Sequence, residues 1–125
     1  MKRLMIVDDA LIMRMKIRET ASKAGWTVVA EASTGCDAIR LFDEHRPDMV
    51  TLDMIMPEMD GLSALKGIRS RHPEAVVVMI SAVSQKENLR ECISAGAMDF
   101  IVKPFDPQQL QAFFERFEQG TEEIV

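Results

Sequence analysis

Five short apolar segments, rich in β-branched residues, recur along the chain and limit its possible folds more than any other feature. Each lacks the polar–apolar alternation of a half-exposed strand, which is typical of strands buried on both faces. Between them, apolar residues recur at helical spacing. Because parallel neighbouring strands need crossover connections, this alternation predicts a parallel sheet covered by helices on both faces. The predicted strands span Leu4–Val7, Thr27–Ala30, Met49–Leu52, Val76–Ile80 and Phe100–Val102.

The predicted helices carry start and stop signals. Asp106 is placed to cap the last helix, Pro107 takes its first position, and Gln109 completes a capping box. Gly25 and Gly96 follow the first and fourth helical segments, where glycine commonly ends a helix. Right-handed crossovers then favour an α/β fold of the flavodoxin-like (βα)5 type, a doubly wound parallel sheet with strand order 2-1-3-4-5. The apolar stripes are Met13, Ile17, Ala21 and Ala24; Leu62, Leu65 and Ile68; and Leu110, Phe113, Phe114 and Phe117.

Length and composition predict one soluble domain, formed by residues 1–120 and followed by a short C-terminal tail at 121–125. The net charge of −5 argues against direct nucleic-acid binding. No apolar run is long enough to insert into a membrane. The apolar stretch that follows the charged first residues ends at Asp8, which is too short for a signal peptide. Cys36 and Cys92 have neither disulfide nor metal-ligand spacing. We therefore expect a cytoplasmic protein.

Polar residues follow the predicted strands where each strand ends. In folds of this class, ligands bind outside the carboxyl ends of the strands, where the strand order reverses. The first and third strands are neighbours in the predicted order, so the carboxylates of Asp8, Asp9 and Asp53 are expected to converge. Ser81 and Lys103 follow the fourth and fifth strands. These five residues form the predicted site.

Each of these residues also has a simpler interpretation: Asp9 as a helix cap, Ser81 as a turn residue, Lys103 as a surface charge. Asp53 is harder to explain, because it follows a buried run, and burying an unpaired carboxylate costs on the order of several kcal/mol. Clustered carboxylates repel one another unless a cation is present, and oxygen ligands without His or Cys suit Mg²⁺. A lysine and a hydroxyl are what a transferred phosphoryl group needs. Together these residues predict Mg²⁺-dependent phosphoryl transfer.

Five motifs resemble those of the receiver domains of bacterial two-component response regulators, of the single-domain, CheY-like kind. They occur in the family's order and at its spacing, and they cover nearly the whole chain. The motifs are Ile6-Val7-Asp8-Asp9, Asp53-Met54-Ile55-Met56-Pro57-Glu58-Met59-Asp60-Gly61, Ile80-Ser81-Ala82, Ala95-Gly96-Ala97 and Lys103-Pro104-Phe105.

The resemblance implies a phosphorelay role with Asp53 as the phosphoacceptor. A sensor histidine kinase or a histidine phosphotransfer protein would donate the phosphoryl group, and chemotaxis is one candidate pathway. Lys103 and Ser81 correspond to the amine and hydroxyl that engage the phosphoryl oxygens, and the Lys103–Pro104 peptide is expected to be cis. The chain would be a signalling switch rather than an enzyme, catalysing only its own phosphorylation and slow autodephosphorylation.

The resemblance also implies a set of metal ligands. Asp8, Asp9, Asp53 and the backbone carbonyl of Ile55 would hold Mg²⁺, with Mn²⁺ as an accepted substitute. Asp9 corresponds to a direct ligand, whereas Asp8 would act largely through metal-bound water.

The resemblance also implies two interaction surfaces, one for the downstream target and one for the phosphoryl donor. On phosphorylation the loop after the fourth strand would be drawn inward through Ser81, and Phe100, at the family's switch-aromatic position, would rotate. The rotation would reshape the face made by the fourth helix, the fifth strand and the fifth helix for a downstream protein; a plain core Phe is the alternative. Leu11 and Met15 lie off the core stripe of the first helix, so they are expected to be exposed. With Phe105 they correspond to the family's docking surface for the phosphohistidine partner, and scattered surface apolarity is the alternative.

Ile55 and Val83 occupy the positions two beyond the acceptor and two beyond the hydroxyl residue, which flank the attacking water in the family. Neither side chain can orient a water, so slow dephosphorylation is expected; loop packing is the alternative. An aspartate-based phosphohydrolase, the rival reading, would carry a second Asp where Ile55 stands. We expect a monomer and leave open both dimerisation on phosphorylation and excision from a longer regulator.

Overall fold

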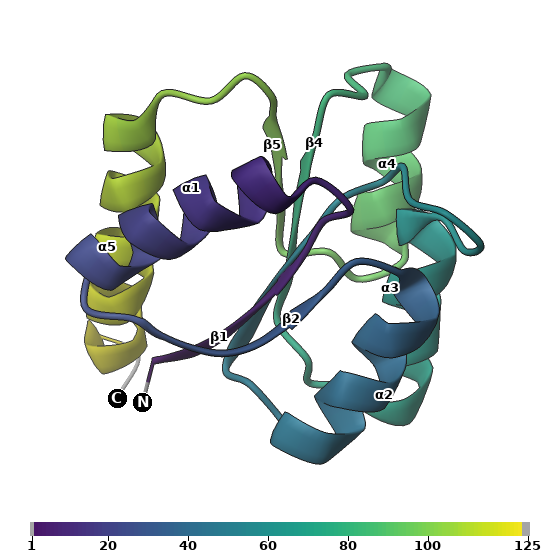
Figure 1. Cartoon of the computed structure of the whole chain (residues 1–125), viewed down its shortest axis with the longest axis horizontal. Helices are drawn as coiled ribbons and strands as arrows, with labels where there is room; N and C mark the ends of the chain where they lie inside the picture. Colours follow the sequence, from purple (N-terminus) through teal and green to yellow (C-terminus); the bar gives the residue numbers. More distant parts are fainter. Residues whose placement is uncertain (1, 124–125) are drawn as a thin grey trace.

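The computed structural model describes the backbone of residues 2–123 and the side chains of residues 2–117. Its centre is a five-stranded parallel sheet of order β2-β1-β3-β4-β5, which confirms the predicted topology. Helices α1 and α5 cover one face of the sheet, and α2, α3 and α4 cover the other (Figure 1). The elements are β1 Arg3–Val7, α1 Leu11–Lys23, β2 Thr27–Ala32, α2 Gly35–His45, β3 Met49–Leu52, α3 Gly61–Arg71, β4 Val77–Ser81, α4 Lys86–Ser94, β5 Asp99–Val102 and α5 Pro107–Glu123.

Burial along the strands follows their place in the sheet. Strands β3 and β4 are buried along their whole length, and β1 is buried beyond its first residue. The outer strands β2 and β5 are only partly buried, so the prediction that all five strands are buried on both faces is wrong for these two. An edge strand has a neighbour on one side only, which leaves it more open to water.

The sheet separates two apolar cores, and successive β1 residues alternate between them. Met5 and Val7 belong to the core under α2, α3 and α4. Leu4 and Ile6 belong to the core under α1 and α5, where the indole Nε1 of Trp26 donates to a carbonyl of α5 at 3.1 Å. Both faces are therefore closed by helices, and the carboxyl ends of the strands remain as the open edge.

Helix α5 begins as the sequence predicts. Asp106 accepts a hydrogen bond from the amide of Gln108 at 2.9 Å, and Pro107 takes the first helical position. The helix continues to Glu123, past residue 120, so the predicted tail is partly helical. Residues 124–125 of that tail lie outside the described residues, and the domain boundary stays a prediction. No helix within residues 2–123 has both the length and the apolarity that crossing a bilayer demands.

Side-chain caps begin α2 and α3, two of the helices on the other face of the sheet. The hydroxyl of Thr34 accepts from an amide of α2 at 3.1 Å, and the carboxylate of Asp60 accepts from the amide of Ser63 at 2.8 Å. Each cap satisfies an amide that has no partner within its helix, which fixes where the helix starts. The start of α3 matters most for the site, because it follows the loop after β3.

Gly61 holds the start of α3 against the end of β3. Its amide donates to the carbonyl of Met54 at 2.7 Å. A Cβ atom at Gly61 would lie 2.1 Å from the carbonyl oxygen of Asp53, closer than any side chain can approach backbone. Glycine is therefore required for the backbone around Asp53 to keep its position.

Candidate functional site

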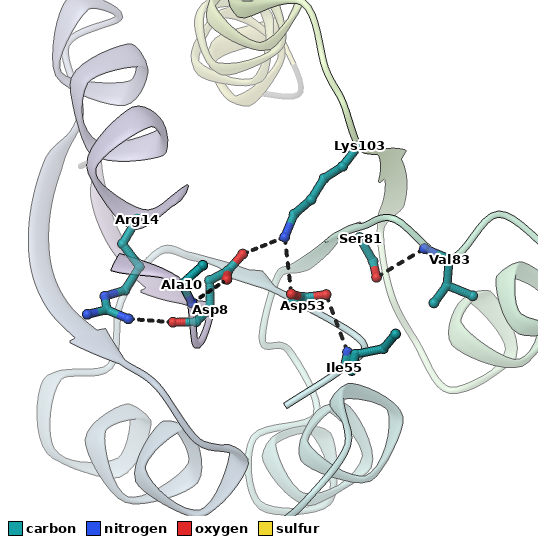
Figure 2. Close-up of polar contacts among 8 residues, drawn as sticks. All are labelled: Asp8, Ala10, Arg14, Asp53, Ile55, Ser81, Val83 and Lys103. Atoms are coloured by element: carbon teal, nitrogen blue, oxygen red, sulfur yellow. Dashed lines mark hydrogen bonds and ion pairs between the residues drawn. The ribbon is translucent and has the colours of Figure 1, made fainter. Parts of the chain in front are cut away.

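Four strands deliver the predicted site residues to one edge of the sheet. Asp8 and Asp53 follow β1 and β3, Ser81 ends β4, and Lys103 follows β5. Figure 2 shows the Lys103 side chain reaching across from β5 toward both carboxylates. Asp8 and Asp53 are 1% and 7% exposed, so both carboxylates are almost completely removed from water. The predicted convergence of these residues is confirmed by the geometry.

Lys103 bridges the two buried carboxylates. Its Nζ lies 2.7 Å from Asp8 Oδ2 and 3.1 Å from Asp53 Oδ2. Such charge-assisted hydrogen bonds are about twice as strong as neutral ones. Burial alone would lower the pKa of Lys103, but the hydrogen bonds that it donates to Asp8 and Asp53 outweigh burial and raise that pKa above its ordinary value. The lysine is therefore held as an ammonium at physiological pH.

The acidic residues fit a hard divalent cation. Asp8, Asp9 and Asp53 each place a carboxylate oxygen within 4.8 Å of the others. Within the described part of the chain, Lys103 is the one cation in ion-pair distance of these groups, so three carboxylates face a single ammonium. Asp9 is exposed and lies on the solvent side of the group, which suits a metal that keeps several waters.

Two backbone amides point into the same site. The amide of Ile55 donates to Asp53 Oδ1 at 3.3 Å, and the amide of Val83 donates to Ser81 Oγ at 3.4 Å. The Ser81 side chain is completely buried. Ile55 is 64% exposed and Val83 is partly buried, so these apolar side chains flank the site from the loops after β3 and β4. The Lys103–Pro104 peptide is cis, as predicted.

The remaining predicted residues lie on α1, on β5 and on the loop after β5. Leu11 and Met15 are each 59% exposed on α1, which confirms the predicted exposure. Phe105 is half-buried on the loop after β5. Phe100 is partly buried on β5 and packs against the core under α4. The sequence reasoning missed Ile12, which is exposed beside Leu11.

Arg14 is a further site residue that sequence reasoning missed. Its guanidinium donates to the backbone carbonyl of Asp8 at 2.6 Å and to Glu31 Oε1 on β2 at 3.1 Å. The only available signal was its position one turn into α1 after the acidic pair, which does not show where a long side chain turns.

The sequence profile of the response regulator receiver domain matches residues 4–115. The chain belongs to this family. Among curated receiver proteins, it is 48% identical over 108 residues to the chemotaxis protein CheY of Bacillus subtilis, covering 86% of this chain and 90% of the relative. It is 46% identical over 109 residues to CheY of Thermotoga maritima, covering 87% and 91% respectively. The receiver family therefore accounts for nearly the full length of the chain.

Solved receiver structures agree with this assignment. CheY in the CheX–CheY–BeF3–Mg complex from Borrelia burgdorferi superposes with a TM-score of 0.88 at 33% identity, covering 93% of this chain and 89% of that one. The shared fold and the acidic edge of the sheet agree with a signalling switch of the receiver type.

The Lys103 bridge generates a pH prediction. Because folding raises the pKa of Lys103 above the unfolded value of 10.5, its contribution to stability is complete below that pH and is lost as pH rises through the folded pKa. Lys103→Met should therefore lower the free energy of unfolding in metal-free buffer at pH 7 by about 1–3 kcal/mol, since buried charged acceptors lose their donor. The gap between parent and variant should shrink above pH 10.5.

Urea unfolding in EDTA at pH 7 and at alkaline pH measures this gap. Lys66→Met, at an exposed position on α3, is the matched control and should leave stability nearly unchanged at both pH values. A gap between parent and Lys103→Met that does not change with pH would show that the ammonium does not stabilise the fold.

Proposed function

We propose that this receiver domain accepts a phosphoryl group on Asp53 and acts as a signalling switch in a phosphorelay. The observation that supports this most directly is the position of the Asp53 carboxylate. It follows a fully buried strand, and one oxygen contacts Lys103 while an oxygen also lies within 4.8 Å of the other acidic side chains. A purely structural role does not explain three clustered carboxylates at the ligand-binding edge of this fold.

The geometry supports an in-line transfer. An Asp53 oxygen attacks the phosphorus of a donor phosphohistidine, the new O–P bond forms as the P–N bond breaks, and the imidazole leaves and takes a proton from solvent. Lys103, already charged beside Asp53 Oδ2, neutralises negative charge on the transferring oxygens. Asp8, Asp9, Asp53 and the carbonyl of Ile55 would hold Mg²⁺, which shields the phosphoryl oxygens when bound. Ser81 would donate to the acyl phosphate.

The relatives suggest the pathway. The CheY relatives of Bacillus subtilis and Thermotoga maritima are chemotaxis proteins, and the Borrelia burgdorferi neighbour was solved bound to CheX. We place this chain in the same kind of pathway, with a histidine kinase or a phosphotransfer protein as donor and a downstream protein as target.

The assignment of the acceptor is tested by Asp53→Asn, which keeps the shape of the side chain and removes the nucleophilic charge. We expect no detectable labelling from acetyl phosphate with Mg²⁺, whereas the circular dichroism spectrum stays unchanged. Asp37→Asn, at a half-exposed carboxylate on α2, is the control and should label like the parent. Labelling of Asp53→Asn at the parent level would exclude Asp53 as the acceptor.

The proposed switch rests on the surroundings of Phe100. Phe100 lines a surface cavity of about 320 Å³ together with Leu110 and Phe113, a volume that would admit a second position of its ring. With fluorophenylalanine at position 100, we expect the fluorine resonance to shift on adding beryllofluoride and Mg²⁺. Ser81→Ala should abolish the shift while Asp53 still takes phosphate. A shift that is equally large in Ser81→Ala would show that the movement of Phe100 does not depend on the Ser81 hydroxyl.

Partner docking is proposed for the exposed apolar start of α1. Leu11→Ser with Met15→Ser should slow transfer from a cognate phosphohistidine protein, because apolar contact is lost, but leave acetyl-phosphate labelling intact. Ile93→Ser, at a 51% exposed position on α4, provides the control and should slow neither reaction. If the double variant lost labelling from both donors equally, the change would have damaged the site rather than the docking surface.

The lifetime of the phosphoryl group is proposed to depend on Ile55 and Val83, whose side chains flank the site and cannot orient a water. Ile55→Asn with Val83→Glu should accelerate hydrolysis by roughly tenfold, below the 10²–10⁴ of a positioned general base because these groups would only orient water. Loss of radiolabel without a phosphatase measures the rate. An unchanged lifetime would show that these two side chains do not set the rate of hydrolysis.

A further inference from the structure

Two hydrogen bonds from one arginine link the edge strand β2 to the acidic loop after β1. Arg14 Nε donates to Glu31 Oε1 at 3.1 Å, and another nitrogen of the same guanidinium donates to the Asp8 carbonyl at 2.6 Å. Figure 2 shows this guanidinium turned toward the loop from its place on α1. Arg18, one turn further along α1, donates from Nε to the other oxygen of Glu31 at 2.8 Å; among the residues that the structure describes, its hydrogen bonds go to Glu31 and not to the loop.

The loop before helix α1 is held by contacts other than a side-chain cap. Helix α1 begins after Ala10, which has no side-chain cap, and its first turn contains no acidic residue. The loop is held by hydrogen bonds from the Asp8 amide to the carbonyl of Ala32, from the Ala10 amide to Asp8 Oδ1, from Lys103 to Asp8 Oδ2 and from Arg14 to the Asp8 carbonyl. The contact from Arg14 differs from the others in joining the backbone of the loop to a side chain that is also paired with β2. Arg14 therefore connects the backbone of the acidic pair to the edge strand.

The charge of Arg14 and its role in holding the loop predict opposite effects on Mg²⁺ affinity. A guanidinium beside the acidic loop repels an incoming cation, so by charge alone removing Arg14 would strengthen Mg²⁺ binding. If the guanidinium instead holds the loop in the geometry that the ion needs, removing it would weaken binding. The side chain of Arg14 is only 16% exposed and is fixed by two partners, which favours the positional effect.

We propose that Arg14 is a positioning residue, which sets the Mg²⁺ affinity of the receiver by clamping the Asp8 carbonyl to Glu31. The inference rests on the proposed function, because it takes the carboxylates of Asp8, Asp9 and Asp53 to be the Mg²⁺ site. Partners that orient metal ligands typically change affinity by about 10–100-fold when lost, and Arg14 acts through backbone, so a loss of about tenfold is expected.

Isothermal titration of the unphosphorylated protein with MgCl₂ tests the proposal. Arg14→Ala and Arg14→Lys should both bind Mg²⁺ about tenfold more weakly, because lysine keeps the charge but cannot contact Glu31 and the carbonyl together. Arg18→Ala is the matched control: it removes the same charge and a contact to the same Glu31, yet it should retain the affinity of the parent. In EDTA, the Ala10 amide should exchange hydrogen faster in both Arg14 variants than in Arg18→Ala.

The outcomes separate the possibilities. Affinities of both Arg14 variants within about twofold of the parent, or an equal loss in Arg18→Ala, would overturn the positioning role while leaving labelling of Asp53 untouched. If Arg14→Ala does not fold, Arg14→Lys alone decides between these results. A parent chain that labels on Asp53 but binds no Mg²⁺ would overturn this inference, whereas a parent that does neither would overturn the proposed function as well.

Discussion

The ammonium of Lys103 joins the carboxyl ends of three strands, and the rest of the site depends on this contact. Asp8 after β1 and Asp53 after β3 are both buried, and Lys103 after β5 supplies the positive charge that lets them lie side by side. Burying ionised groups is unfavourable unless they are paired and hydrogen-bonded. The pairing is incomplete because Asp9 adds a third carboxylate. This remaining negative charge makes the edge of the sheet suited to a divalent cation.

The surrounding backbone keeps these groups at fixed positions. Gly61 brings the start of α3 so close to Asp53 that no side chain fits between them. Arg14 holds the loop after β1 from a helix that has no side-chain cap of its own. Functional groups held on rigid elements keep their geometry more precisely than groups on free loops. In this receiver the strands bring the reacting side chains together, and these few contacts fix the loops that carry them.

The sequence predicts the topology and the site well because both depend on patterns of short range. Apolar runs that end in polar residues define the strands and also the ends where Asp53 and Ser81 lie. Edge burial was predicted less well, since a run such as Thr27–Ala30 reads the same whether it has one neighbour or two. The role of Arg14 was not predictable, because its partners lie six and seventeen residues away and the direction of its side chain depends on packing. The resemblance to receiver domains supplied the residue roles that spacing alone could not.

The central claim is that Asp53 becomes an acyl phosphate. It is tested most directly by reducing the protein with borohydride after incubation with acetyl phosphate and Mg²⁺, since this reagent converts an aspartyl phosphate to homoserine. Peptide mass spectrometry then reads the modified position. We predict homoserine at position 53, dependent on both acetyl phosphate and Mg²⁺. Homoserine at Asp8 or Asp9 instead, or none at any position in a folded and Mg²⁺-loaded protein, would contradict the account.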